Sequence, residues 1–276
     1  MEKLFEVRLA AQKDYDYLKQ LFMLCFEDSP ETVNAFFENT VSPERVVAVF
    51  DGDRAVSSLY LLESDIIIDG ESYDAYYIYG VCTHPEYRKK GLMRTLFHFT
   101  EKLVGERKIN YLFLVPAENY LFDVYSQFGF EKGIYYKEET VNAPVICNDI
   151  PFTDKVYYDS YIAFCLERSK SGVATFSLNE STFKSFFSSV TGEISAIQTE
   201  NGYCVFENSN GKITVFEVFG NENELLNIVL QKTKVSSVVC RLPADDKNNA
   251  IPYGMFKRFG SAPEIENAFF GVPYST

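Results

Sequence analysis

The chain has 276 residues, 46% of them apolar, and a formal net charge of −13. This apolar fraction is enough to form real cores and excludes global disorder, and the length allows roughly two domains of about 100–200 residues each. No apolar run reaches the roughly 18 residues that a membrane span needs, and the first residues lack the apolar stretch of a signal peptide.

The six cysteines are scattered and form no Cys-x-x-Cys pair. We therefore expect free core thiols in a cytosolic (cytoplasmic) protein, not disulfides or metal ligands. With only two histidines, His84 and His98, a metal site built on histidine is not expected.

The negative charge is concentrated in the first half. Residues 1–150 carry 25 acidic and 15 basic side chains, and the rest carry 14 and 11. This balance speaks against nucleic-acid binding, which requires a broad basic face. An acidic surround would attract a cationic substrate, although solubility alone could also explain the acidity.

The first half alternates strand and helix patterns in a recognisable order. Strands are predicted at 5–9, 45–50, 55–63, 72–83 and 111–115, and helices at 14–26, 29–39 and 92–108. Turn residues at Asp51-Gly52 and Asp69-Gly70 join residues 45–83 into a three-stranded antiparallel meander. The run 111–115 is entirely apolar, which is typical of a buried parallel strand.

A basic loop separates the strand ending near Thr83 from the helix that begins at Leu92. It contains three consecutive cations, Arg88-Lys89-Lys90, followed by Gly91. A helix N-terminus offers unpaired N–H groups and a positive dipole end, and Gly91 allows a bulky anion to come close. The pattern predicts a phosphate site, and a solvated surface loop is the competing interpretation.

A second motif follows the strand 111–115. Asn119, Phe122 and Tyr125 are spaced three residues apart, so they share one face of a short helix that ends at Gly129. Taken alone, Tyr125 would be read as a core aromatic.

The second half repeats the order of the first. Helices are predicted at 157–168, 181–190 and 223–232, and strands at 173–178, 192–197, 203–207, 212–219, 236–242 and 252–259. A meander, a helix and a buried strand again follow one another. Residues 140–154 are predicted to be the crossover, and the last residues are expected to return to the first half.

Both motifs resemble those of the GCN5-related N-acetyltransferases, the GNAT superfamily. Residues 88–93 resemble the loop Arg/Gln-x-x-Gly-x-Gly/Ala, and residues 119–130 resemble Asn-x-x-Ala-x-x-Tyr-x-x-x-Gly-Phe. Met93 and Phe122 depart from the small residues usual at their positions. The form Arg-x-x-Gly-Leu is more similar to the enhanced-intracellular-survival branch of the superfamily.

The resemblance implies an α/β (α+β) fold, a mixed sheet flanked by helices, and acetyl-CoA as co-substrate. The loop that would hold the pyrophosphate consists of Arg88, Lys89, Lys90, Gly91, Leu92, Met93 and Arg94. The backbone N–H of Val81 would meet the oxyanion, with Cys82 and Thr83 continuing the contacts to pantetheine where two strands splay beside Gly80. Asn119 would bond the pantetheine arm, and the Tyr125 hydroxyl would protonate the departing thiolate.

The attacking amine must lose a proton, which requires a base. Glu118 is the first candidate, against the interpretation that it is only a solvated acid at a helix start. The branch resemblance offers the terminal carboxylate of Thr276 as an alternative, and a chain of waters is a third. Tyr77 and Tyr79 lie on one side of their strand and Tyr76 on the other, and one or two of them could line an acceptor pocket.

We therefore expect a catalytic GNAT domain at 1–142 and a degenerate GNAT-like domain at 143–276. Glu222 and Glu224 stand where the second half would need cations, so we expect it not to bind CoA. It could instead wall the acceptor cleft or support a homo-oligomer.

The sequence predicts an N-acetyltransferase that acts on a primary amine of a cationic small molecule, such as an aminoglycoside or a polyamine. A peptide or protein amine is the alternative acceptor. A non-catalytic acyl-CoA-binding regulator is the alternative class.

Overall fold

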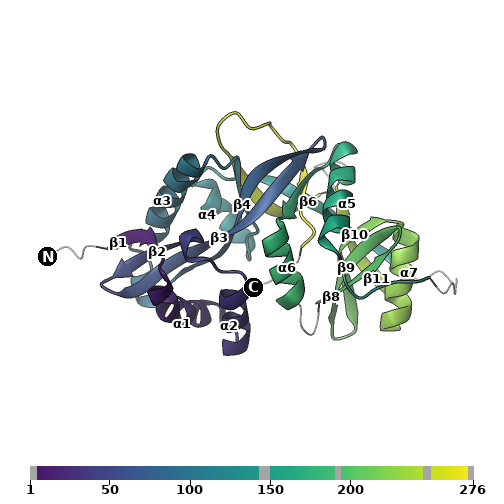
Figure 1. The fold of residues 1–276 in the computed structure, drawn as a ribbon, viewed down its shortest axis with the longest axis horizontal. Helices are drawn as coiled ribbons and strands as arrows, with labels where there is room; N and C mark the ends of the chain where they lie inside the picture. Colours follow the sequence, from purple (N-terminus) through teal and green to yellow (C-terminus); the bar gives the residue numbers. More distant parts are fainter. Residues whose placement is uncertain (1–4, 143–149, 190–193, 245–249, 273–276) are drawn as a thin grey trace.

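The computed structural model describes residues 5–142, 150–189, 194–244 and 250–272. The first half follows the predicted order of elements (Figure 1). Its elements are β1 (Glu6–Leu9), α1 (Tyr15–Phe26), α2 (Pro30–Asn39), β2 (Val46–Asp51), β3 (Arg54–Ile68), β4 (Glu71–Thr83), α3 (Leu92–Arg107), β5 (Tyr111–Leu114), α4 (Asn119–Ser126) and β6 (Glu131–Asn142). Short 3-10 helices precede α1, β2 and α3: η1 (Gln12–Asp14), η2 (Pro43–Arg45) and η3 (Pro85–Tyr87).

Local signals set the limits of several elements. The Ser29 side chain accepts a hydrogen bond from the Thr32 N–H, and Pro30 is the first residue of α2, as predicted. Asp69 and Gly70 both have positive φ, +51° and +86°, as a two-residue hairpin turn requires. The hairpin at these residues is therefore confirmed, although β3 extends to Ile68 rather than ending at Glu63.

Helices cover both faces of the first-half sheet (Figure 1). Strands β1 to β4 are antiparallel neighbours, and β5 pairs with β4 in parallel. Apolar residues of α1 and α2 pack in one core cluster with one face of the sheet. Residues of α3 and α4 pack in a second cluster with the opposite face. The sheet therefore has a face covered by α1 and α2 and a face covered by α3 and α4.

The second half contains the predicted repeat. Its elements are α5 (Tyr158–Lys170), β7 (Ala174–Leu178), α6 (Glu180–Ser189), β8 (Ile194–Thr199), β9 (Gly202–Ser209), β10 (Lys212–Gly220), α7 (Glu222–Thr233), β11 (Ser237–Pro243), β12 (Ile251–Arg258) and β13 (Ala268–Phe269). Strands β8, β9 and β10 form an antiparallel meander, and β11 pairs with β10 in parallel after α7. The first half has the same arrangement in β2, β3, β4, α3 and β5.

The C-terminal part of the chain returns to the first half, as predicted. Strand β12 lies between β5 and β6 and is antiparallel to both, and β6 pairs on its other side with β11. In the described part of the chain, one sheet of 13 strands has the order β1-β2-β3-β4-β5-β12-β6-β11-β10-β9-β8, with β7 and β13 off this path. The division of the chain at residue 142 stays a prediction.

Two strands were not predicted. β6 carries charges at Lys132, Lys137, Glu138 and Glu139, which hide its apolar alternation. β13 has only two residues and pairs with β6 and β7. Both are positioned by partners that are distant in sequence.

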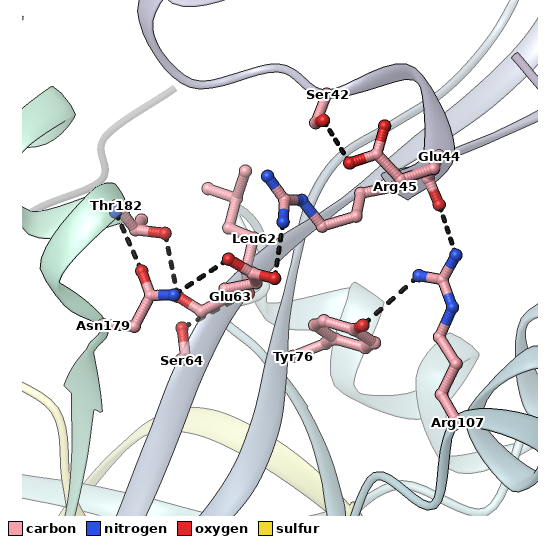
Figure 2. Close-up of polar contacts among 10 residues, drawn as sticks. All are labelled: Ser42, Glu44, Arg45, Leu62, Glu63, Ser64, Tyr76, Arg107, Asn179 and Thr182. Carbon is pink, nitrogen blue, oxygen red and sulfur yellow. Dashed lines mark hydrogen bonds and ion pairs between the residues drawn. The ribbon is translucent and has the colours of Figure 1, made fainter. Parts of the chain in front are cut away.

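Polar contacts join the second half to β3, as Figure 2 shows. The Glu63 carboxylate pairs with Arg45 at 2.5 Å and accepts a hydrogen bond from Asn179 Nδ2 at 2.9 Å. The Thr182 hydroxyl, at the start of α6, donates to the backbone oxygen of Glu63 at 2.8 Å. These contacts fix α6 against the long β3–β4 hairpin.

Candidate active site

Strands β4 and β5 separate near the middle of β4. They pair only from Ala75 to Tyr77, opposite the residues 111–113, while β4 continues to Thr83. Among the described strands, none pairs with β4 on this side beyond Tyr77. The edge from Ile78 to Thr83 therefore presents backbone N–H and C=O groups to an extended ligand. The splay expected from the sequence is present.

A β-bulge lies at the same place in β4. The register against β3 shifts between Ser58 and Tyr60, so Gly80 and Val81 together face one residue of β3. Gly80 has a φ of +58°, and a Cβ there would lie 2.8 Å from the Phe22 ring, so only glycine fits. A bulge leaves one residue outside the ladder, which suits an N–H donor such as that of Val81.

The basic loop is exposed and open on its outer side. Lys89 and Gly91 have left-handed backbones, with φ of +62° and +77°. The Arg88 Nε donates to the Thr83 oxygen at 3.3 Å, which holds the guanidinium beside the end of β4. Nothing lies within 4 Å of where a Cβ on Gly91 would stand. The loop is therefore open to solvent around Gly91.

The N-terminus of α3 has no side-chain cap. Gly91 occupies the N-cap position without a capping hydrogen bond, so the first N–H groups lack intrahelical partners. Leu92 is buried, and Met93 packs against the core cluster beneath α3, which explains why a bulky residue is accommodated there. Arg94 is exposed, with its guanidinium 5.7 Å from the Phe128 ring.

The second motif forms α4, with its members in different surroundings. Phe122 and Tyr125 are buried, as their shared face predicts, whereas Asn119 lies exposed in the first turn. Glu118 is the exposed N-cap residue and makes no capping hydrogen bond. In the part of the chain that the structure describes, neither the Asn119 amide nor the Glu118 carboxylate has a polar partner, so both side chains are available to a ligand.

Tyr125 is held in an aromatic environment. Its ring lies edge-on to Phe97 of α3 at 5.9 Å and to Phe130 at 6.3 Å. Burial raises the pKa of Tyr125 to about 12, so the phenol stays protonated at neutral pH. The hydroxyl makes no hydrogen bond to another described residue and can donate to a ligand.

The face covered by α1 and α2 carries a residue that sequence reasoning missed. Asp28, in the loop between these helices, is half-buried, and burial raises the pKa of its carboxyl. Burial and the nearby Asp28 charge both raise the pKa of Tyr79, one residue before the bulge. The Tyr79 ring packs on Phe36 at 5.3 Å and Phe22 at 6.2 Å. The sequence shows an acid between two helices, but not which strand it faces.

The corresponding helix start in the second half is closed. The Asn221 side chain caps α7 by accepting from the Glu224 N–H at 3.3 Å. The Asn201 amide donates to the Glu224 carboxylate at 3.2 Å. A Cβ on Gly220 would lie 1.9 Å from the Asn201 oxygen. Here the helix N-terminus is satisfied by the protein itself and carries acidic side chains.

The described cysteines are all free thiols. Cys82, Cys165, Cys204 and Cys240 are buried free thiols, and Cys25 is half-buried. Cys147 and Thr276 lie outside the described residues. No group of three or more His, Cys, Asp or Glu side chains within the described ranges could hold a metal ion. None of the helices described is both long and apolar enough to cross a membrane.

Residues 6–133, which include both motifs, match the family model of an acetyltransferase (GNAT) domain. The chain carries a GNAT acetyltransferase domain. The match confirms the predicted superfamily for residues 6–133 and, at the level of the family, the predicted acyltransferase class. No curated protein matches the sequence.

Solved structures share the fold over nearly the whole chain. A GCN5-related N-acetyltransferase from Anabaena variabilis has a TM-score of 0.73 and 15% identity, covering 92% of this chain and 73% of that one. Eis1 from Mycobacterium abscessus has a TM-score of 0.66 and 11% identity, with the same coverage of both chains. A protein from Pyrococcus horikoshii has a TM-score of 0.63 and 14% identity, covering 97% of this chain and 94% of that one. These likenesses confirm the predicted α/β fold, in which a GNAT domain is followed by a second, related sheet region.

Proposed function

We propose that the protein transfers the acetyl group of acetyl-CoA to a primary amine. The observation that carries this proposal is the unpaired edge of β4 beside the uncapped N-terminus of α3. One end of this site offers backbone hydrogen bonds to an extended arm, and the other offers helix N–H groups and cations to a pyrophosphate. Acetyl-CoA has both parts, at a spacing set by its pantetheine arm.

The proposed contacts follow the chain from the loop inward. Residues 88–94 hold the pyrophosphate, and the backbone from Val81 to Thr83 bonds the pantetheine arm. The exposed Asn119 amide meets the same arm from α4. The open space beyond Gly91 supports this assignment, because a bulky anion needs room at the helix start.

Two donors serve the reaction. The Val81 N–H stabilises the negative charge that develops on the carbonyl oxygen when the amine attacks. The Tyr125 phenol, protonated at neutral pH, donates to the sulfur as the carbon–sulfur bond breaks. Both are held in place before the reaction, Val81 by the bulge and Tyr125 by the aromatic rings around it.

The acceptor is proposed to be a cationic small molecule, such as an aminoglycoside or a polyamine. Asp28 and the aromatic group at Tyr79 and Phe36 lie on the face opposite α3, so an amine could approach the bulge from there. A half-buried carboxylate and aromatic rings both attract a cation. Glu118 remains the proposed base, and Asp28 joins it as a second candidate because its raised pKa favours accepting a proton.

The second half is proposed to support the fold without binding CoA. The capped start of α7, with Glu222 and Glu224 in its first turn, would repel a pyrophosphate. A peptide or protein amine remains the alternative acceptor. A non-catalytic acyl-CoA-binding regulator would keep the loop but would not need the Tyr125 hydroxyl.

The test is free-thiol release from acetyl-CoA by the purified protein, with aminoglycosides, polyamines, amino acids and short peptides as acceptors. Release with cationic small amines is expected, and release only with peptides would replace the acceptor class. If acetyl-CoA raises the melting temperature but no amine supports release, the enzyme proposal fails in favour of the regulator.

A further inference from the structure

Two cysteines meet on the face of β4 that α1 covers. Cys82 is 6% exposed and belongs to the core cluster that includes Leu21 and Phe22 of α1. Cys25, in the last turn of α1, packs against the same cluster and is only half-buried. The Cys25 Sγ lies 3.7 Å from the backbone oxygen of Thr83, the residue that follows Cys82. A thiol pair that links a helix end to a strand is therefore reachable from solvent through Cys25.

The pair lies next to the proposed pyrophosphate loop. The Cys25 Sγ points at the Thr83 backbone oxygen at 3.7 Å, and the Arg88 Nε donates to that same oxygen at 3.3 Å. The Cys82 Sγ and the Ser58 hydroxyl share a hydrogen bond of 3.3 Å. A change at the thiols therefore acts directly on the end of β4 and on Arg88.

The two thiols differ in reactivity. The neighbouring Cys82 thiol, together with the positive charge of Arg88, lowers the pKa of Cys25 to about 7. The neighbouring Cys25 thiol and burial raise the pKa of Cys82 well above its usual value. Of the two thiols, Cys25 is therefore the more readily deprotonated and the more nucleophilic.

We propose that Cys25 and Cys82 are a peroxide-reactive pair that closes to a reversible disulfide and thereby switches the acetyl-CoA site off. The oxidation itself is independent of the proposed function, whereas the effect on turnover rests on it.

The chemistry balances with hydrogen peroxide as the oxidant. The Cys25 thiolate attacks one peroxide oxygen, the O–O bond breaks, and Cys25 becomes a sulfenic acid as hydroxide leaves. The Cys82 sulfur then attacks the Cys25 sulfur, and the sulfenic hydroxyl leaves as water with the Cys82 proton. Two thiols lose two electrons in total, peroxide is reduced to two waters, and a dithiol reductant reverses the change.

The disulfide would alter the site through geometry. Closing the disulfide requires the two sulfurs to reach a bond length of about 2.05 Å with a fixed dihedral angle. Because Cys25 ends α1 and Cys82 follows the bulge, this movement shifts the Thr83 carbonyl on which Arg88 rests. Both ends of the proposed acetyl-CoA site are then displaced.

The test uses the full chain, reduced and freed of reductant, then treated with hydrogen peroxide and desalted. Remaining thiols are alkylated under denaturing conditions and mapped by mass spectrometry. A peptide pair linking Cys25 to Cys82 is expected, released by dithiothreitol, with Cys165, Cys204 and Cys240 still alkylated as internal controls. Retention of both thiols, or oxidation of Cys25 while Cys82 remains a thiol, would overturn the pair.

A second measurement follows turnover of acetyl-CoA. Peroxide treatment should abolish thiol release by the wild type, and dithiothreitol should restore it. The C25S variant should keep its own starting rate through the same treatment. Formation of the linked peptide with unchanged turnover would overturn the switch. A protein that is inactive before oxidation would refute the proposed function, while peptide mapping would still decide whether the pair forms.

Discussion

Tyr125 is the residue on which the proposed chemistry depends most directly. Tyr125→Phe removes the hydroxyl and keeps the ring against Phe97 and Phe130. Turnover should fall by about 10²–10³-fold, the range for loss of one general acid, with acetyl-CoA affinity unchanged. Steady-state kinetics and calorimetric titration measure the two effects. Tyr120→Phe is the matched control, because Tyr120 is 65% exposed on the same helix. Equal turnover in both variants would remove Tyr125 from the mechanism.

Arg88 should contribute to binding instead of turnover. Arg88→Ala removes a charge-assisted contact to the pyrophosphate, so the dissociation constant for CoA should rise by roughly tenfold. Calorimetric titration with CoA gives this value directly. Lys102→Ala is the control, because Lys102 is a cation on α3 whose side chain is 75% exposed. If the two variants bind CoA equally well, the loop is not the pyrophosphate site.

Local spacing predicted the candidate residues that lie within one motif. The cations before α3 and the three-residue spacing in α4 are properties of short segments. The structure places the cations at the start of α3 and buries Phe122 and Tyr125, whereas Asn119 is exposed. Asp28 could not be found in this way. Its relation to Tyr79 depends on how α1 packs across the sheet, which the sequence near either residue does not encode.

The β3–β4 hairpin contains an electrostatic conflict that can be measured at the scale of the element. Asp65 lies opposite Asp74 in the register. Burial, with a smaller effect of the Asp74 charge, raises the pKa of Asp65 to about 6. In the unfolded chain this pKa is about 4. Between about pH 4 and pH 6 the Asp65 carboxyl is therefore protonated in the folded state but ionised in the unfolded state. The free energy of unfolding is highest below about pH 4, falls as the pH rises through this window, and stays lower above pH 6.

Asp65→Asn should remove this pH-dependent loss of stability. We expect the variant to exceed the wild type in free energy of unfolding by roughly 1–2 kcal/mol above pH 6, after allowing for partial exposure, and to match it near pH 4. Urea unfolding at several pH values measures this. Asp74→Asn, at the more exposed partner, should give a smaller gain in the same window. A gain of equal size at pH 4 and pH 7 would show that ionisation of Asp65 is not the cause.

Elements with strong periodicity were predictable, and those defined by their partners were not. α1, α2 and α3 have apolar faces and clear ends in the sequence. By contrast, β6 alternates weakly because much of it is charged, and the end of β3 beyond Glu63 pairs with the distant strand β7 as well as with β4. Such strands are recognisable only once their neighbours are known.

At the scale of the whole molecule, β12 makes the two halves dependent on each other. Residues 1–142 expressed alone would lack β12, which leaves one edge of β5 unpaired, and would lack every described strand that pairs with β6. We expect this fragment to lack a cooperative thermal transition. Linking residues 250–272 to it through a flexible segment should restore one. Circular dichroism melting measures both, and a cooperative melt of 1–142 alone would show that it is an independent domain.

The sequence predicted a return of the chain end but not its place between β5 and β6. Pairing over more than a hundred residues leaves no local trace, because any apolar strand could occupy that position. The repeat of meander, helix and strand was visible since it depends only on the order of elements. The two halves therefore looked more separate in the sequence than they are in the continuous sheet.

The most direct test of the acetyl-CoA site is a crystal structure of the protein with CoA bound. The pyrophosphate should lie at the N-terminus of α3 against residues 88–94, with the pantetheine arm along β4 from Val81 to Thr83 and its sulfur near the Tyr125 hydroxyl. CoA bound at the start of α7, or anywhere away from the splay of β4 and β5, would contradict the account.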